Sequence, residues 1–288
     1  MILNDFKPFK MNEYVSSTLL GGLGNQLYSI AFVLKYAKEH NKIAIFEDIP
    51  NSNGAGTHGC KTAFHTLFDN KLKTIPSKEY KNIHFHLVHE NNPLKIQNIP
   101  KYNGNILFYG YFGSYKYHDE NIRIDMTKLV YSNQELINIS KSYFSKIQND
   151  FNEYNIEKYV FMHIRRTDFL IANYHTNLTY YIDAYKKLHK EYNDKNIIVF
   201  SDDIEWCKNN MKDLFLHIFF VELNDTYIEF ILMTYFKFGI IDRSTFSWWA
   251  AYLGEKNKYI IAPLKRYGGE SELQETYEFT YPKEWKLV

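Results

Sequence analysis

The segment Tyr159-Val-Phe-Met-His-Ile-Arg-Arg-Thr-Asp168 is an apolar run that ends abruptly in charged residues. Its first six residues predict a buried strand, and Arg165 and Arg166 follow that strand directly. In open α/β sheets, ligands bind beyond the carboxyl ends of the strands. Guanidinium groups match phosphate oxygens with bidentate, charge-assisted hydrogen bonds. Taken alone, however, the segment is explained more simply by solvated arginines and a capping aspartate, because surface arginines are common.

The sequence after this segment alternates apolar strands with helices. The expected strands and helices occupy residues 159–164, 178–192, 197–200, 204–210, 218–221, 226–237, 239–241, 248–253 and 259–262. Such alternation predicts a parallel sheet that is covered by helices on both faces.

A similar unit is predicted in the first half of the chain. Gly21-Gly-Leu-Gly24 separates an expected strand at 15–20 from a helix at 27–40, and another strand follows at 42–46. The glycines permit a tight turn and close approach of a ligand, and the helix start offers free N–H groups. The Gly-Gly-x-Gly spacing is not that of a dinucleotide site, which stays a weak alternative. We therefore expect two Rossmann-like domains, residues 1–150 and 151–288, that face a cleft.

Three polar clusters follow predicted strands of the second half. They are His163/Arg165/Arg166/Asp168, Ser201/Asp202/Asp203 and Ser244/Thr245/Ser247. In a parallel sheet the three clusters would share one edge. Each cluster also has a plainer explanation, since Ser, Thr and Asp commonly cap helices. Trp248 and Trp249 are expected in the core rather than on a ligand surface.

Composition narrows the class of protein. The chain has 288 residues and a net charge of +1, so no strong field attracts it to nucleic acid or to acidic membranes. Cys60 and Cys207 belong to no disulfide or zinc pattern, and we expect no metal site. The sequence begins with no signal peptide and contains no run of about 20 apolar residues. We expect a cytoplasmic location; the sequence does not fix the oligomeric state.

Four motifs together resemble those of the α-1,2-fucosyltransferases of glycosyltransferase family 11. They occur in order between about residues 18 and 265 and comprise Gly21-Gly-Leu-Gly-Asn-Gln-Leu-Tyr28, His163-Ile-Arg-Arg-Thr-Asp168, Phe200-Ser-Asp-Asp-Ile-Glu-Trp206 and Ser244-Thr-Phe-Ser-Trp-Trp249. The resemblance implies a GT-B-like fold, an acceptor-binding first half and a nucleotide-binding second half. It implies an inverting, metal-independent enzyme without a cofactor. The enzyme would move L-fucose from GDP-fucose to a glycan hydroxyl, O2 of a galactoside. Alternatives are another activated deoxysugar, such as a rhamnose donor, or a non-catalytic carbohydrate-binding relative.

The resemblance also implies roles for individual residues. Arg165, Arg166 and Asp168 would be catalytic, with the arginines on the donor diphosphate. Asp168 is a candidate general base, although we favour a role in holding the arginines. The remaining donor-binding candidates are Gly22, Gly24, Asn25, Gln26, His163, Ser201, Asp202, Glu229, Ser244, Thr245 and Ser247. Guanine presents two adjacent N–H donors, which a carboxylate at Glu229 or Asp202 could accept.

The sequence departs from the family pattern at several positions. Thr167 stands where the family usually has glycine, and Asp242-Arg243 stands where it usually has Ala-Asn. Glu229 replaces a common aspartate. Animal members carry a membrane anchor that this sequence lacks, which indicates a bacterial or viral type. These departures bear more on the donor sugar than on the class of reaction.

Overall fold

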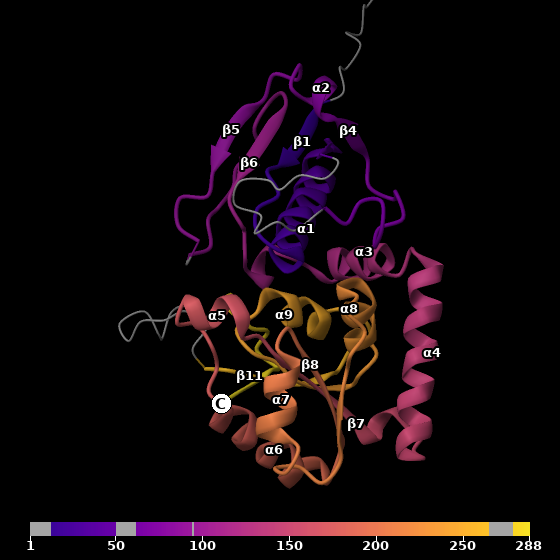
Figure 1. The fold of residues 1–288 in the computed structure, drawn as a ribbon. Coiled ribbons are helices and arrows are strands. Elements are labelled where there is room, and N and C mark those ends of the chain that lie inside the picture. The colour runs from indigo at the N-terminus through magenta and orange to yellow at the C-terminus, as the bar shows by residue number, and fades with distance from the viewer. Residues whose placement is uncertain (1–12, 50–61, 94, 265–278) are drawn as a thin grey trace, which may run out of the picture.

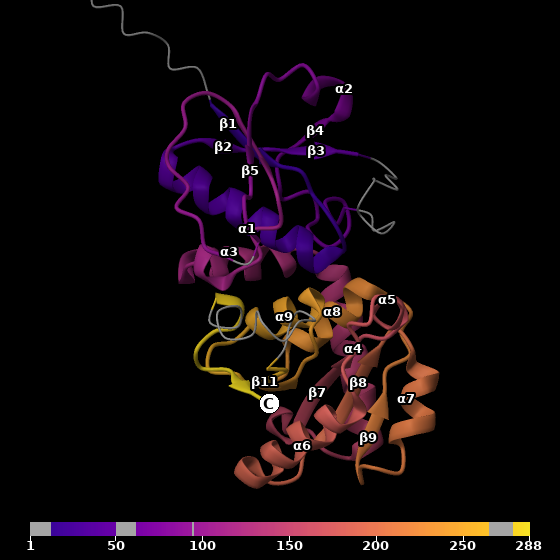
Figure 2. The same ribbon diagram turned by 90° about the vertical axis from the view of Figure 1, so that its left-hand side faces the viewer.

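The described residues form two main parallel sheets, one in each half of the chain (Figures 1 and 2), and a two-stranded sheet in the first half. A computed structural model describes residues 13–49, 62–93, 95–264 and 279–288. The first half contains β1 (Tyr14–Ser17), α1 (Leu23–His40), β2 (Ile43–Ala44), β3 (Phe46–Asp48), β4 (Thr74–Pro76), α2 (Ser77–Tyr80), β5 (His86–His89), β6 (Ile106–Tyr109), the 3-10 helix η1 (Tyr115–Tyr117) and α3 (Glu120–Val130). Its main sheet has the order β2-β1-β6-β5, and β3 pairs separately with β4.

The second half builds a larger sheet of order β12-β11-β10-β7-β8-β9. Its elements are α4 (Gln134–Phe151), η2 (Ile156–Lys158), β7 (Tyr159–Ile164), α5 (Thr167–Ile171), α6 (Leu178–Tyr192), β8 (Asn196–Ser201), α7 (Ile204–Met211), β9 (Ile218–Phe220), α8 (Thr226–Thr234), β10 (Phe238–Ile240), α9 (Thr245–Tyr252), β11 (Tyr259–Ala262) and β12 (Lys286–Leu287). All strand pairs of this sheet are parallel. The predicted α/β class is confirmed.

β7 lies inside this sheet, and all six of its residues are buried. It pairs in register with β8 from Tyr159↔Asn196 to Ile164↔Ser201, and with β10 on its other side. A strand with neighbours on both sides and helices over both faces has no polar face. This explains why the segment is apolar up to its charged end, except at His163, which contacts Asp242.

The two halves meet where α1 lies against α9 (Figure 2), and aromatic side chains make this contact. The ring of Tyr28 on α1 lies 4.9 Å from that of Trp248 and 5.1 Å from that of Trp249, measured between centroids. Both tryptophans are almost fully buried, as predicted. Apolar contact of this kind holds the start of α1 near the start of α9.

The predicted domain boundary near residue 150 stays a prediction. α4 ends at Phe151 and packs along α8 of the second half (Figure 1).

Within the described residues, no helix has the length and apolar character that crossing a bilayer requires. The same part of the chain holds no group of His, Cys, Asp and Glu side chains arranged for a metal. Cys207 is a buried free thiol, and Cys60 lies outside the described residues.

Candidate active site

The carboxyl ends of β7 and β10 form the topological switch point of the larger sheet. The chain proceeds outward from β7 to β8 and β9, then returns to β10 on the other side of β7. Ligands of open α/β sheets bind at such a point, beyond the carboxyl ends of the two strands. Here Arg165 and Arg166 follow β7, and Asp242, Arg243 and Ser244 follow β10.

Asp242 links the two strand ends, although the sequence marked it only as a departure from the family pattern. Its side chain is fully buried. One carboxylate oxygen accepts a hydrogen bond from the backbone N–H of Ser244 at 2.8 Å and lies 3.4 Å from Nδ1 of His163. The Ser247 hydroxyl donates to the same oxygen at 3.4 Å, and the N–H of Arg165 donates to the other oxygen. Asp242 thus fixes His163 and Arg165 against the start of α9.

Asp202 fixes the turn that carries the arginines. Its carboxylate accepts from the backbone N–H of Arg166 at 2.8 Å and from that of Thr167 at 3.2 Å. The hydroxyl of Thr167 donates to the same carboxylate, and Nε of Arg165 lies 3.2 Å from it. These contacts give Thr167 a specific role that glycine could not supply. Because both carboxylate oxygens of Asp202 accept hydrogen bonds from this turn, Glu229 is the remaining candidate for a carboxylate that binds guanine.

Each arginine is oriented through Nε. Nε of Arg165 donates to Asp168 at 2.8 Å, and Nε of Arg166 donates to Asp203 at 3.1 Å. The guanidinium of Arg166 also lies 3.5 Å from the ring centre of Trp206, which is a close cation–π contact. Among the described residues, no hydrogen bond uses the terminal Nη atoms of either arginine. The paired Nη edge is the part of guanidinium that binds phosphate in a bidentate manner.

The remaining members of the polar clusters cap helices or hold loops. Asp203 caps α7 by accepting from Trp206 N–H at 3.3 Å, and the Ser201 hydroxyl accepts from Asp203 N–H at 3.0 Å. Ser244 caps α9 by accepting from Phe246 N–H at 3.3 Å. The helix-cap explanation is therefore correct for Asp203 and Ser244. Thr245 is half-buried at the start of α9.

The glycine turn of the first half reaches this site directly. A Cβ on Gly24 would lie 2.4 Å from the carbonyl carbon of Thr245 and 2.5 Å from the N of Phe246. Gly22 caps the start of α1, so the amino ends of α1 and α9 meet here. Gln26 is buried, and its amide donates to Gly21 O at 3.1 Å, which holds the turn.

Two carboxyl groups near the crevice have shifted pKa values. Burial raises the pKa of Glu229, on α8, to about 7, with a smaller opposing effect of His163. Burial also disfavours ionisation of Asp168, but the hydrogen bond and charge of Arg165 outweigh it and lower the Asp168 pKa. A lowered pKa makes Asp168 a weaker proton acceptor and favours its role in holding Arg165.

The structure thus assembles most of the predicted residues at one edge. Contacts join the His163–Asp168 motif, Asp202 and the Ser244–Ser247 motif, and Gly24 packs on the last of these. The contacts of Asp203 and Trp206 with Arg166, and the role of Asp242, were not predicted from the sequence. The position of Asp242, two residues after the end of β10, was the available signal, since ligands bind beyond the carboxyl ends of such strands.

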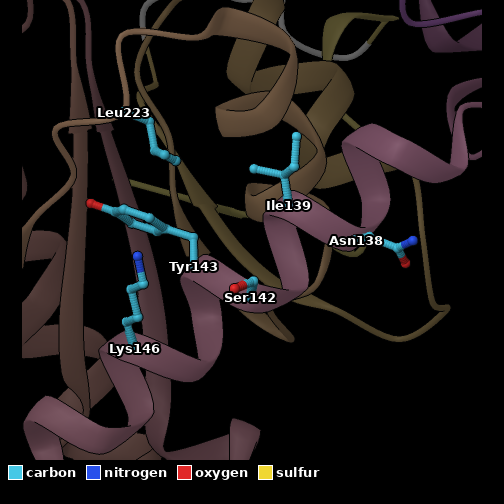
Figure 3. Close-up of a pocket in the computed structure, with 6 residues that line it drawn as sticks. All are labelled: Asn138, Ile139, Ser142, Tyr143, Lys146 and Leu223. Atoms are coloured by element: carbon cyan, nitrogen blue, oxygen red, sulfur yellow. The ribbon is translucent and has the colours of Figure 1, made fainter.

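An open hollow lies elsewhere, along α4 (Figure 3), with a volume of about 380 Å³. Its lining is Asn138, Ile139, Ser142, Tyr143, Lys146 and Leu223. None of the motif residues takes part in it. The convergence of charged groups and helix starts at the switch point is the stronger indication of a site.

The chain belongs to glycosyltransferase family 11, whose model matches residues 15–288. An alpha-1,2-colitosyltransferase of Escherichia coli is 28% identical over 266 residues, which cover 83% of this chain and 87% of that protein. The O-antigen biosynthesis glycosyltransferase WbnK of Escherichia coli is 25% identical over 300 residues, which cover 91% of this chain and 98% of that protein.

The fold is GT-B-like, as predicted. The crystal structure of the fucosyltransferase NodZ from Bradyrhizobium is similar, with a TM-score of 0.55, 12% identity, and coverage of 84% of this chain and 93% of that one. POFUT1 in complex with GDP has a TM-score of 0.54, 13% identity, and coverage of 87% and 98%. At such low identity the likeness shows the fold alone.

Proposed function

We propose that this protein transfers L-fucose from GDP-fucose to a glycan hydroxyl, O2 of a galactoside, with inversion and without a metal. The observation that carries the proposal is the presentation of Arg165 and Arg166 at the switch point, with Nε fixed by carboxylates and the Nη edge unpaired within the described residues. Membership of family 11 supports the class of reaction, and an α-1,2-specific relative supports the linkage. The similar fold of a NodZ alpha-1,6-fucosyltransferase crystal soaked with GDP-fucose, with a TM-score of 0.56, is consistent with this donor.

The reaction needs positioned positive charge more than covalent chemistry. The acceptor oxygen attacks the anomeric carbon of the sugar while the bond from that carbon to the β-phosphate oxygen breaks. GDP leaves with the bonding electron pair, and the hydroxyl proton passes to a base. Because the transition state is oxocarbenium-like, negative charge grows on the diphosphate as the bond lengthens. Fixed arginine donors can stabilise that charge by several kcal/mol.

Glu229 is proposed to select the guanine base. An ionised carboxylate can accept the two adjacent N–H donors of guanine, which uracil does not present. Asp202 is committed to Arg166 and Thr167, whereas the side chain of Glu229 forms no hydrogen bond with the described residues. The donor-binding roles of Asn25, Gln26, His163, Ser201 and the Ser244–Ser247 motif follow from the family resemblance and are part of the same proposal.

The second candidate is the transfer of another activated deoxysugar. The name of the Escherichia coli relative favours colitose over the rhamnose considered first. Colitose is fucose without its 3-hydroxyl, so the two sugars present the same diphosphate and anomeric carbon. Discrimination would depend on side chains that contact that one hydroxyl.

A donor screen with linkage analysis tests both candidates. The purified protein is incubated with a mixture of galactose-terminated oligosaccharides and, in parallel, GDP-fucose, GDP-colitose, GDP-rhamnose or UDP-galactose. We expect GDP-fucose to give a product whose new linkage is α-1,2 by NMR. If only GDP-colitose gave a product, the donor would be GDP-colitose rather than GDP-fucose, and the proposed mechanism would stand. Binding of GDP-fucose without turnover of any donor would instead identify a non-catalytic relative.

A further inference from the structure

We propose that Arg243 binds the donor diphosphate from the β10 side of the crevice, opposite Arg165. The inference rests on the proposed function and adds a binding residue to it. Arg243 directly follows Asp242, beyond the carboxyl end of β10 and on the other side of the switch point from Arg165. In the family pattern, asparagine usually stands at this position, so the role would be specific to this chain.

The charges around the two β7 arginines leave no excess of positive charge. Arg165 is paired with Asp168 and Asp202, and Arg166 is paired with Asp203. Three carboxylates therefore face two guanidinium groups. A diphosphate carries at least two negative charges, so a site built on these arginines alone would hold it weakly. A third guanidinium at the same switch point, that of Arg243, would reduce this deficit.

Arg243 is not engaged elsewhere in the described part of the chain. There its Nε is enclosed without a hydrogen-bond partner, and its guanidinium forms no ion pair. An enclosed donor that lacks an acceptor is unfavourable. By contrast, Arg123 illustrates a structural arginine: it pairs with Glu120 and donates to Gly254 O at 2.7 Å. Arg243 is suited instead to an acceptor that arrives with a ligand.

Two helix starts lie next to Arg243. Ser244 begins α9, and the amino end of α1 packs on Thr245 through Gly24. Both helices are at least eight residues long, so both helix starts present a partial positive charge and N–H groups at this place. Helix starts alone do not define a site. Together with a guanidinium that has no partner among the described residues and follows β10 at the switch point, they favour a diphosphate between Arg165 and Arg243.

Binding measurements on Arg243→Ala and Arg243→Lys test the inference. Dissociation constants for GDP and guanosine are measured by calorimetry or competition, because guanosine reports contacts to the base and ribose without phosphate. A matched control is Lys190→Ala, which removes one positive charge from the exposed last turn of α6. We expect Arg243→Ala to weaken GDP binding by about tenfold or more, as for a lost charge-assisted hydrogen bond. Guanosine binding should change by less than about twofold, Arg243→Lys should recover part of the loss, and the control should match wild type.

The outcomes separate this inference from the function on which it rests. If wild type binds GDP and Arg243→Ala binds it equally well, the inference is wrong and the proposed function stands. If GDP and guanosine weaken together, Arg243 supports the fold of the site and does not contact phosphate, which also overturns the inference. If wild type does not bind GDP, both the proposed function and the inference fail.

Discussion

Gly24 of the first half lies directly against the backbone of Thr245 in the second half. A Cβ at Gly24 would come within 2.5 Å of the carbonyl oxygen of Thr245, a distance that real Cβ atoms do not adopt. This contact joins the glycine motif to the Ser-Thr-Phe-Ser motif, although more than 200 residues separate them. The two halves can therefore approach this closely at the switch point only because residue 24 is a glycine without a side chain.

Replacement of Gly24 by alanine should disturb both stability and activity. The methyl group would push α1 away from α9, and overpacking of this kind costs roughly 1–3 kcal/mol. Thermal unfolding should show the loss, and the KM for the donor should rise. Gly113→Ala is the control, because the nearest atom to its Cβ would be 4.0 Å away. A Gly24→Ala variant as stable as Gly113→Ala would contradict the proposed close contact.

Arg166→Ala should nearly abolish transfer while the protein remains folded. The loss removes a donor that stabilises the departing diphosphate, and we expect kcat to fall by about 10²–10³-fold. Steady-state kinetics and circular dichroism measure the two properties. Trp206→Phe is the companion variant, since a phenyl ring retains a face for the guanidinium now 3.5 Å from the indole. Near-normal turnover by Arg166→Ala would refute the catalytic assignment.

Thr167 should act through its hydroxyl. Thr167→Val keeps the shape of the side chain but removes the hydrogen bond to Asp202, so the arginine turn loses one of its anchors. We expect kcat/KM for the donor to fall by roughly three- to tenfold, in line with about 0.5–1.5 kcal/mol for one hydrogen bond. Thr167→Ser retains the hydroxyl and should stay near wild type. Equal activity of the valine and serine variants would show that the hydroxyl is dispensable.

The raised pKa of Glu229 should make nucleotide binding depend on pH. The carboxyl group accepts N–H donors of guanine only when it is ionised, so GDP affinity should rise as pH increases through about 7. Between pH 6 and pH 8 the ionised fraction of such a group grows about tenfold. Calorimetry on wild type and Glu229→Gln measures this effect, and the variant subtracts titration of the GDP phosphates. Identical pH profiles would remove Glu229 from guanine recognition.

The free energy of unfolding should fall as pH increases, whereas the affinity for GDP should rise. The folded protein holds a proton on Glu229 up to about pH 7, whereas the unfolded chain releases it near the ordinary value of 4.5. In this window the native state binds more protons, so this group lowers the free energy of unfolding as pH rises from about 4.5 to about 7. Denaturant unfolding at several pH values should show that the free energy of unfolding declines less steeply with pH for Glu229→Gln than for wild type.

Much of the second half was predictable because its strands are buried on both faces. Such strands form largely apolar runs, of which 159–164 is the clearest, and helices of regular period separate them. The region between residues 61 and 100 was not predictable in the same way. Its strands β4 and β5 have only three and four residues; β4 is mostly half-buried and β5 is largely exposed, so no period develops. Short edge strands depend on pairing with neighbours rather than on local sequence.

The site was predictable in position but not in its hydrogen-bond partners. Strand ends indicated where Arg165, Asp202 and Ser244 would meet, since parallel strands share an edge. The partners of each arginine were not evident, because those contacts join residues far apart in sequence. Asp242 illustrates the limit: it is 77 residues from Arg165 and appeared only as an unusual residue ahead of a motif. Its contacts with His163 and Arg165 become apparent only once β7 and β10 are side by side.

A crystal structure of the protein with GDP tests the central claim most directly. We predict electron density for the diphosphate beyond the carboxyl ends of β7 and β10, within hydrogen-bond distance of Arg165 or Arg166, with guanine near Glu229. Density for the nucleotide elsewhere, such as the hollow along α4, would contradict the account. So would an unliganded crevice at a GDP concentration that saturates binding in solution.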